Sequence, residues 1–380
     1  MSEYQYYDFR AIDKPLSDIE MKELRGISSR AEITPVSFIN VYNYGDLQAR
    51  PRNLMQHYFD AHVYLSNFGT ATLMLRLPKD AVDEQALQAF AVEDYLDVEP
   101  VGDYWLLTWS LAESENYEDY EDEDGGSWMA RLVPLREELL RGDLRSLYIG
   151  WLQAVTVEDG DAEREPMALT DLGKLTAAQH ALAEFLAVDQ DLLAGAGIGS
   201  RVESSDERMV AALDVWLEEL PREEIRQYMH QMLTGQGAQA ERTLKRSFTA
   251  WRSQANPQDQ TATCRTVEEL WQQAEQAKAV RLARKAEAQR KTAAAQKKTM
   301  EALLTHVAKN STTFWKKAHE EAERTCASGY DSACEVLVNL RDAYELQGNS
   351  DTFRQEFKKF MAGHSRRKAF TNRLEKAGLL

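Results

Sequence analysis

A run of 43 residues, 266–308, limits the fold of this chain more than any other feature. It contains neither Gly nor Pro and is rich in Ala, Lys, Arg, Gln and Glu, which favour helix. Large apolar residues stand near both ends, whereas the apolar residues of 283–299 are all Ala. We therefore predict one helix, about 65 Å long at roughly 1.5 Å per residue, with packed ends and a solvated middle. The side chains expected to anchor the ends are Val267, Leu270 and Trp271, and Met300, Leu303, Leu304 and Val307.

The middle of this helix is strongly basic. Within residues 278–298, eight Lys and Arg stand against a single acidic residue, Glu287. A heptad count from Val267 places Lys and Arg on the seam, which excludes a coiled coil. Such a helix is either a solvated strut or a ligand for something anionic. The candidate anion-binding residues are Lys278, Arg281, Arg284, Lys285, Arg290, Lys291, Lys297 and Lys298.

Three anionic partners fit this segment on charge. A nucleic acid would bind with an affinity that falls steeply with salt. An anionic membrane surface is disfavoured, because the middle of the helix lacks the Trp, Phe and Leu face of an interfacial helix. The third partner is internal, the acidic stretch 80–130, although salt screens attraction between exposed charges strongly.

The net charge of −17 is unevenly distributed along the chain. Residues 80–130 contain 16 acidic side chains and no Lys or Arg, whereas residues 241–380 carry 26 basic and 17 acidic side chains. The total therefore excludes an anion-binding surface over the whole protein but permits a local one.

The densest acidic run, ESENYEDYEDEDGGS, covers residues 113–127 and cannot fill a core. It does not match a calcium-binding EF-hand loop, since Tyr120 and Arg131 would occupy ligand positions. We expect either a solubilising linker or a surface that binds a basic partner. The candidate residues are Glu118, Asp119, Glu121, Asp122, Glu123 and Asp124.

The fold class expected is α+β, with a small mixed α/β N-terminal domain and a mainly α-helical C-terminal region that contains the long basic helix. Strands are predicted at 4–12, 33–44, 72–77, 95–98 and 104–110, and helices after Ser17, from Pro51 through Ala61, and at 83–91, giving a sheet with helices on one or both faces. From Trp128 onward apolar residues recur at helical spacing. The predicted parts are a mixed α/β domain at 1–112, an acidic linker at 113–127, a helical domain at 128–255 and a basic helical domain at 256–380.

No familiar catalytic or cofactor motif stands out, so we expect no cofactor, no metal and no enzyme. The glycines of LLAGAGIGS, residues 192–200, indicate a helix end and linker rather than a phosphate loop, because they follow a helical pattern. The His- and Tyr-rich patch from His57 to Tyr64 is the one place where an unfamiliar enzyme site could lie. Three cysteines, Cys264, Cys326 and Cys334, fit buried thiols in a reducing cytoplasm. No stretch approaches the roughly 18 to 20 apolar residues of a membrane span.

Three segments, YQYYDFRAID, TPVSFINVYNYGD and LTAAQHALAEFLAVDQDLLAGA, resemble stretches of a family of uncharacterised bacterial proteins of similar length. The resemblance implies a bacterial, cytoplasmic setting, and multi-domain binding proteins of this kind sometimes belong to anti-phage defence systems. From the missing catalytic motifs and the segregated charge, we expect a non-enzymatic cytoplasmic interaction protein, an adaptor or sensor acting through protein partners, for which the resemblance suggests a setting in bacterial anti-phage defence. The alternatives are a nucleic-acid-binding protein that uses residues 278–298, and an enzyme with an unrecognised site.

Overall fold

A computed structural model describes residues 4–112, 126–157, 163–200, 206–235, 237–255 and 264–380. The chain divides into two compact units, an N-terminal unit of Met1–Val280 and a C-terminal unit of Arg281–Leu380. An antiparallel sheet with helices followed by a mainly helical region confirms the expected α+β class. The acidic residues 113–125 lie outside the described residues.

A seven-stranded antiparallel sheet organises the N-terminal unit, in the order β2-β3-β1-β4-β5-β7-β6. The strands are β1 (Gln5–Arg10), β2 (Glu32–Thr34), β3 (Ser37–Tyr42), β4 (Ala61–Ser66), β5 (Ala71–Pro78), β6 (Leu96–Val101) and β7 (Tyr104–Leu111). Side chains on successive residues point to opposite faces, so β1 places Tyr7 and Phe9 in one hydrophobic core and Tyr6 in another.

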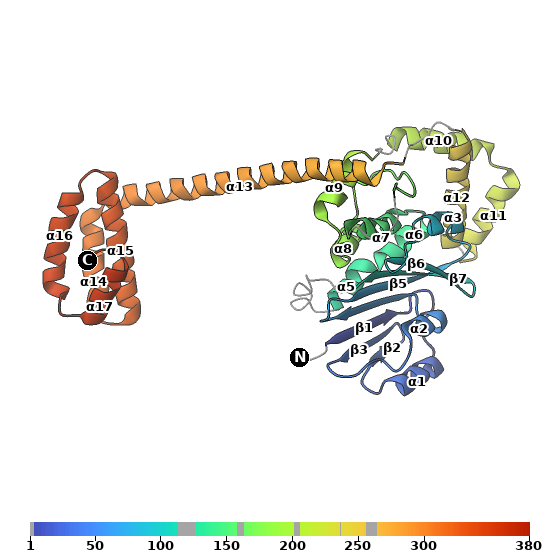
Figure 1. Ribbon diagram of the computed structural model, residues 1–380, viewed down its shortest axis with the longest axis horizontal. Coiled ribbons are helices and arrows are strands. Elements are labelled where there is room, and N and C mark those ends of the chain that lie inside the picture. Colours follow the sequence, from blue (N-terminus) through green and yellow to red (C-terminus); the bar gives the residue numbers. More distant parts are fainter. Residues whose placement is uncertain (1–3, 113–125, 158–162, 201–205, 236, 256–263) are drawn as a thin grey trace. The chain divides into compact units, whose positions relative to one another are not determined.

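Helices cover both faces of this sheet (Figure 1). One core lies against α1 (Asp18–Ile27) and α2 (Pro51–His57). The other and larger core packs β4 to β7 against a group of helices, and α3 (Glu84–Ala89) contributes Leu87 to it. That group comprises α5 (Gly126–Leu132), α6 (Pro134–Leu140), α7 (Arg145–Thr156), α8 (Ala177–Phe185) and α9 (Gln190–Ile198). Residues from the predicted 1–112 and 128–255 segments thus share one core.

Two local predictions in the sheet region were wrong. The predicted helix from Pro51 through Ala61 ends at His57, and Ala61 already begins β4. This strand lies between β1 and β5 and pairs with both, so backbone hydrogen bonds on two sides stabilise the extended conformation. The single strand predicted at 33–44 is instead a hairpin of β2 and β3.

The N-terminal unit also contains α10 (Asp206–Glu219), α11 (Arg222–Leu233) and α12 (Gly237–Ala255). Trp216 of α10 lies 5.4 Å from Phe248 of α12, measured between ring centroids. The indole of Trp251 donates a hydrogen bond to Glu219, which fastens α12 to the end of α10.

The C-terminal unit is a helical bundle (Figure 1). Its helices include α14 (Ser311–Glu323), α15 (Ala327–Leu346), α16 (Ser350–His364) and α17 (Lys368–Lys376). Phe353, Phe357 and Phe360 of α16 enter its core. His319 Nδ1 and His364 Nε2 lie 2.9 Å apart and link α14 to α16.

Candidate binding surface on helix α13

Helix α13 (Val267–Lys309) confirms the predicted long helix within one residue at each end. Its start is fixed by a capping box, in which Thr266 Oγ1 accepts from the Glu269 amide and Glu269 accepts from the Thr266 amide. The preceding backbone pairs with an earlier segment, since the Glu165 amide donates to the carbonyl of Arg265 and the Val267 amide to that of Glu163.

A buried ion pair holds the start of α13 to α7. The Glu165 carboxylate, 4% exposed, accepts a hydrogen bond from the Tyr148 hydroxyl at 2.7 Å. The same carboxylate accepts from the Arg265 guanidinium through Nε and Nη2, and from the Arg265 backbone amide. Burial and the adjacent Glu165 charge raise the pKa of Tyr148 well above its ordinary value, so the phenol stays protonated and donates. Because the two halves of the pair stand 100 residues apart, spacing could not predict it.

A glycine contact brings α9 against the first turns of α13. A Cβ atom at Gly195 would lie 2.5 Å from the backbone nitrogen of Ala274 and 2.8 Å from its Cα. Only a residue without a side chain permits this approach. Leu270 and Ala274 are correspondingly buried. The prediction of a helix end and linker therefore fits Gly199, which caps α9, but was wrong for Gly195, which lies inside the helix and makes a packing contact.

The other end of α13 enters the core of the C-terminal unit. Leu304 and Val307 are buried there, as predicted. Met300 and Leu303 are 51% and 40% exposed, so their predicted role as anchors was wrong. The two anchors thus belong to two separate hydrophobic cores, one in each unit.

Between the anchors α13 is exposed. Of the eight predicted anion-binding residues, Arg281 is partly buried, and the other seven are exposed: Lys278, Arg284, Lys285, Arg290, Lys291, Lys297 and Lys298. Three of these lysines make ion pairs within the helix, namely Lys278 with Glu275, Lys291 with Glu287, and Lys297 with Glu301. Within the part of the chain that the structure describes, Arg284, Lys285, Arg290 and Lys298 make no ion pair.

The second predicted surface is not described. Glu118, Asp119, Glu121, Asp122, Glu123 and Asp124 all lie within residues 113–125, outside the described residues. Binding of a basic partner by this segment, and masking of the basic helix by it, remain predictions from the sequence.

The His- and Tyr-rich patch that motivated the enzymatic alternative is occupied by packing and ion pairing. His62 is fully buried, and its ring stacks 3.8 Å from that of Phe9. Burial lowers the pKa of His62 to about 3, so the ring is neutral and donates from Nδ1 to the Asp8 carbonyl. Asp60 accepts two hydrogen bonds from the Arg76 guanidinium. The His62 hydrogen bond joins β4 to β1, and Arg76 of β5 holds Asp60, the residue before β4. His57 stands apart from these contacts as an exposed side chain.

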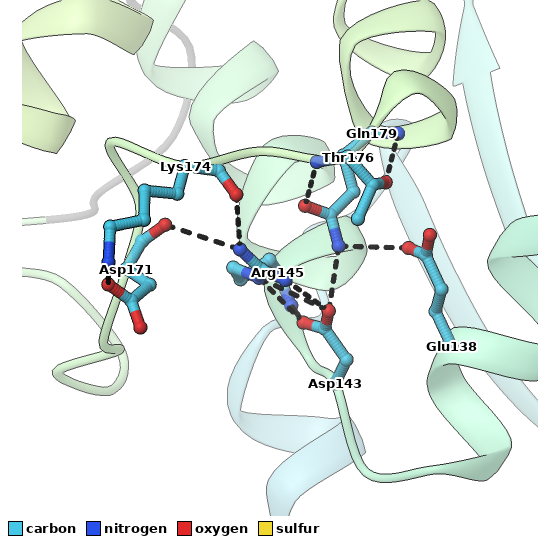
Figure 2. A network of polar contacts seen from close by, with 7 residues as sticks. All are labelled: Glu138, Asp143, Arg145, Asp171, Lys174, Thr176 and Gln179. Atoms are coloured by element: carbon cyan, nitrogen blue, oxygen red, sulfur yellow. Dashed lines mark hydrogen bonds and ion pairs between the residues drawn. The ribbon is translucent and has the colours of Figure 1, made fainter. Parts of the chain in front are cut away.

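A polar network that the sequence did not indicate ties α6, α7 and α8 together (Figure 2). The Asp143 carboxylate accepts from Arg145 and from the buried amide of Gln179, which also donates to Glu138. Burial alone would raise the pKa of Asp143, but these donors hold it below the usual range. A capping box of Thr176 and Gln179 orients the side-chain amide of Gln179 at the start of α8. The role of the network is therefore structural, since it holds these helices together.

The cysteines were predicted to be buried. Cys334 is buried and Cys264 partly so, but Cys326 is exposed, because it caps the start of α15, where its Sγ accepts from the Gly329 amide. In the described ranges, no group of three or more His, Cys, Asp or Glu side chains could hold a metal ion.

No family model, curated protein or solved structure matches the chain. Its class is defined by its own fold and surface, an α+β chain with an exposed basic segment in α13, a helix whose two ends contribute side chains to separate hydrophobic cores. Across the described residues, no helix combines the length and apolar character needed to cross a membrane.

Proposed function

We propose that this chain is a non-enzymatic interaction protein, an adaptor that acts through an anionic macromolecular partner bound by the basic middle of α13. The observation that carries the proposal is the exposure of seven of the eight Lys and Arg residues within 278–298, on a segment whose packing contacts lie at its two ends. An acidic protein surface and a nucleic acid both offer the closely spaced negative charges that such a segment would bind.

The charge balance supports a binding surface over a solvated strut. A strut would gain about 0.2–0.5 kcal/mol from each Glu and Lys pair spaced four residues apart. Residues 278–298 contain one Glu, Glu287, for eight cations. Like charges at Arg281 and Lys285 stand four residues apart and repel by a similar amount. The excess of positive charge lowers helix stability relative to a charge-balanced segment. Binding of an anionic partner would explain why the excess is present.

The test removes the four cations without an ion pair. The binding variant replaces Arg284, Lys285, Arg290 and Lys298 with Gln, which keeps helix propensity. The matched control replaces four exposed cations of the C-terminal unit, Lys317, Lys358, Arg366 and Lys368, with Gln. Both variants lose four positive charges from the full chain. We expect the wild type and the control to be retained on immobilised heparin, a polyanion, and the binding variant to elute at lower salt.

Equal shifts in both variants would contradict the proposal, because they would show that total charge and not the α13 segment sets retention. A wild-type chain that does not bind the polyanion at about 50 mM salt would contradict it too, since electrostatic binding is strongest at low salt. Helical content measured by circular dichroism establishes that the variant helix is intact.

We further propose a cytoplasmic setting. All three cysteines are free thiols, and one of them, Cys326, is exposed. Free exposed thiols persist where the compartment is reducing. Fractionation of the native host, with the protein followed by antibody, tests this setting, and recovery from an oxidising compartment would contradict it.

A further inference from the structure

The arrangement of cations around α13 differs from side to side. At about 100° per residue, Arg284, Lys291 and Lys298 recur every seven residues and form one stripe, the back stripe. Lys278 and Lys285 form a first flank, and Arg290 and Lys297 form a second flank. The two flanks lie about 120° apart around the helix, and the back stripe lies between them on the opposite side.

Between the two flanks runs a face without charge, the front face. It consists of Leu282, Ala286, Gln289 and Ala293, spaced four, three and four residues apart. Each flank lies about 60° from its centre, and the back stripe lies about 170° away. All four front-face residues are exposed, Leu282 by 50%. The front face therefore presents small, amide and apolar side chains between two rows of cations.

The acidic residue of the basic segment stands on the other side. Glu287 lies next to the back stripe and pairs with Lys291 at 2.6 Å. Each group of cations contains one ion pair within the helix, because Lys278 of the first flank pairs with Glu275 and Lys297 of the second flank pairs with Glu301. Among the described residues, Lys285 and Arg290 of the flanks make no ion pair, and neither do Arg284 and Lys298 of the back stripe.

From this arrangement, and resting on the proposed function, we infer that α13 binds double-stranded DNA with its front face in the major groove. The groove of B-form DNA is about 12 Å wide and admits one α-helix, with a phosphate backbone on either side. Two flanks of cations with an uncharged face between them match that cross-section. A flat anionic surface would instead be met by cations gathered on one face.

The side chains of the front face suit the floor of that groove. Ala lets a helix backbone approach the base edges closely, and both Ala and Leu contact the thymine methyl group. Gln289 carries an amide of the kind that pairs with adenine through two hydrogen bonds. The front face spans about 16 Å along the helix, the length of about five base pairs. The duplex groove of RNA is too deep and narrow for a helix, which makes DNA the partner.

The experiment compares two variants of equal charge in the full chain. The flank variant carries Lys285→Gln, Arg290→Gln and Lys297→Gln. The back variant carries Arg284→Gln, Lys291→Gln and Lys298→Gln. Binding to a fluorescent duplex of about 20 base pairs is measured by anisotropy at several salt concentrations. Since each phosphate contact contributes about 0.9 to the slope of log K against log salt, we expect the flank variant to lose about 2.7 from that slope.

In affinity, the flank variant should weaken on the order of 100-fold at about 100 mM salt, and the back variant by only a few-fold. Equal losses in the two variants, a larger loss in the back variant, or equally tight binding of single-stranded DNA or duplex RNA would each overturn the inference. Retention on heparin together with no binding to the duplex would also overturn it, while leaving the proposed function intact. If heparin retention failed as well, the proposed function itself would be wrong.

Discussion

The contact between α9 and α13 makes the sharpest prediction about stability. Replacing Gly195 with Ala puts a methyl group 2.5 Å from the Ala274 backbone nitrogen, where ordinary contacts are 3.4 Å or longer. The clash is with backbone, so no side-chain rotation relieves it, and the two helices must separate by about 1 Å. Overpacking of this kind costs typically 1–3 kcal/mol.

The matched control is Gly26→Ala in α1. This glycine also lies in a helix of the N-terminal unit, but an added Cβ would meet nothing within 4 Å. Intrinsic preference favours Ala over Gly in a helix by up to about 1 kcal/mol. The control should therefore be neutral or slightly stabilising. Gly195→Ala gains the same helix preference, which offsets part of the overpacking cost, so its net effect should be a destabilisation of about 1–2 kcal/mol.

Hydrogen exchange in the full chain gives a local measurement, because it reports the opening of one segment without requiring two-state unfolding. In Gly195→Ala we expect the amides of residues 270–277 to lose protection by about tenfold, which corresponds to 1.4 kcal/mol, while the C-terminal unit keeps its protection. In Gly26→Ala these amides should be unchanged. If both variants protected residues 270–277 equally well, the close packing of α9 on α13 would be refuted.

Three further predictions concern buried polar groups. Because the pKa of His62 is lowered, the unfolded chain binds a proton that the native unit excludes. The stability of the N-terminal unit should therefore fall as pH drops from about 6.5 towards 3, by at most about 1.4 kcal/mol per pH unit. Urea titrations at several pH values should show that the unfolding free energy depends less steeply on pH in His62→Phe than in the wild type. Glu165→Gln removes the negative charge that pairs with the buried Arg265 guanidinium, and it should lower the unfolding free energy of the N-terminal unit by about 3–5 kcal/mol in chemical denaturation. A loss below about 1 kcal/mol would disprove the structural role of the pair. Burial and the nearby Arg367 lower the pKa of His364, so thermal unfolding of the C-terminal unit should move to lower temperature as pH falls through about 6.5, and this dependence should weaken in His364→Gln.

The features that sequence predicted well are those fixed by neighbours in the chain. Helix α13 follows from a long run of helix-forming residues, and the capping box of Thr266 and Glu269 stabilises its first turn. Exposure of its middle follows from the small size of its apolar residues. Neither conclusion requires knowledge of what lies nearby in space, so both could be reached without a structure.

The features that sequence missed are fixed by distant residues. The segment AHVYLS has the alternation of a strand, but it follows a proline that suits a helix start, and its pairing with β1 and β5 decides its conformation. The carboxylate of Glu165 meets its guanidinium partner 100 residues later. Gly195 looks like a residue at a helix end until Ala274 is placed against it.

This difference determines which features of the candidate surface can be predicted from the sequence alone. A cation that faces solvent keeps its position on a helix through helical periodicity alone, so the stripes of α13 follow from residue numbers once the helix is continuous. The anchors fix where the helix begins and ends, whereas its solvated middle gains little from tertiary contact and depends on local helix propensity. Loosening the contact of Gly195 with Ala274 should therefore leave anion binding by residues 281–298 unchanged, because these residues belong to the C-terminal unit and keep all their charges.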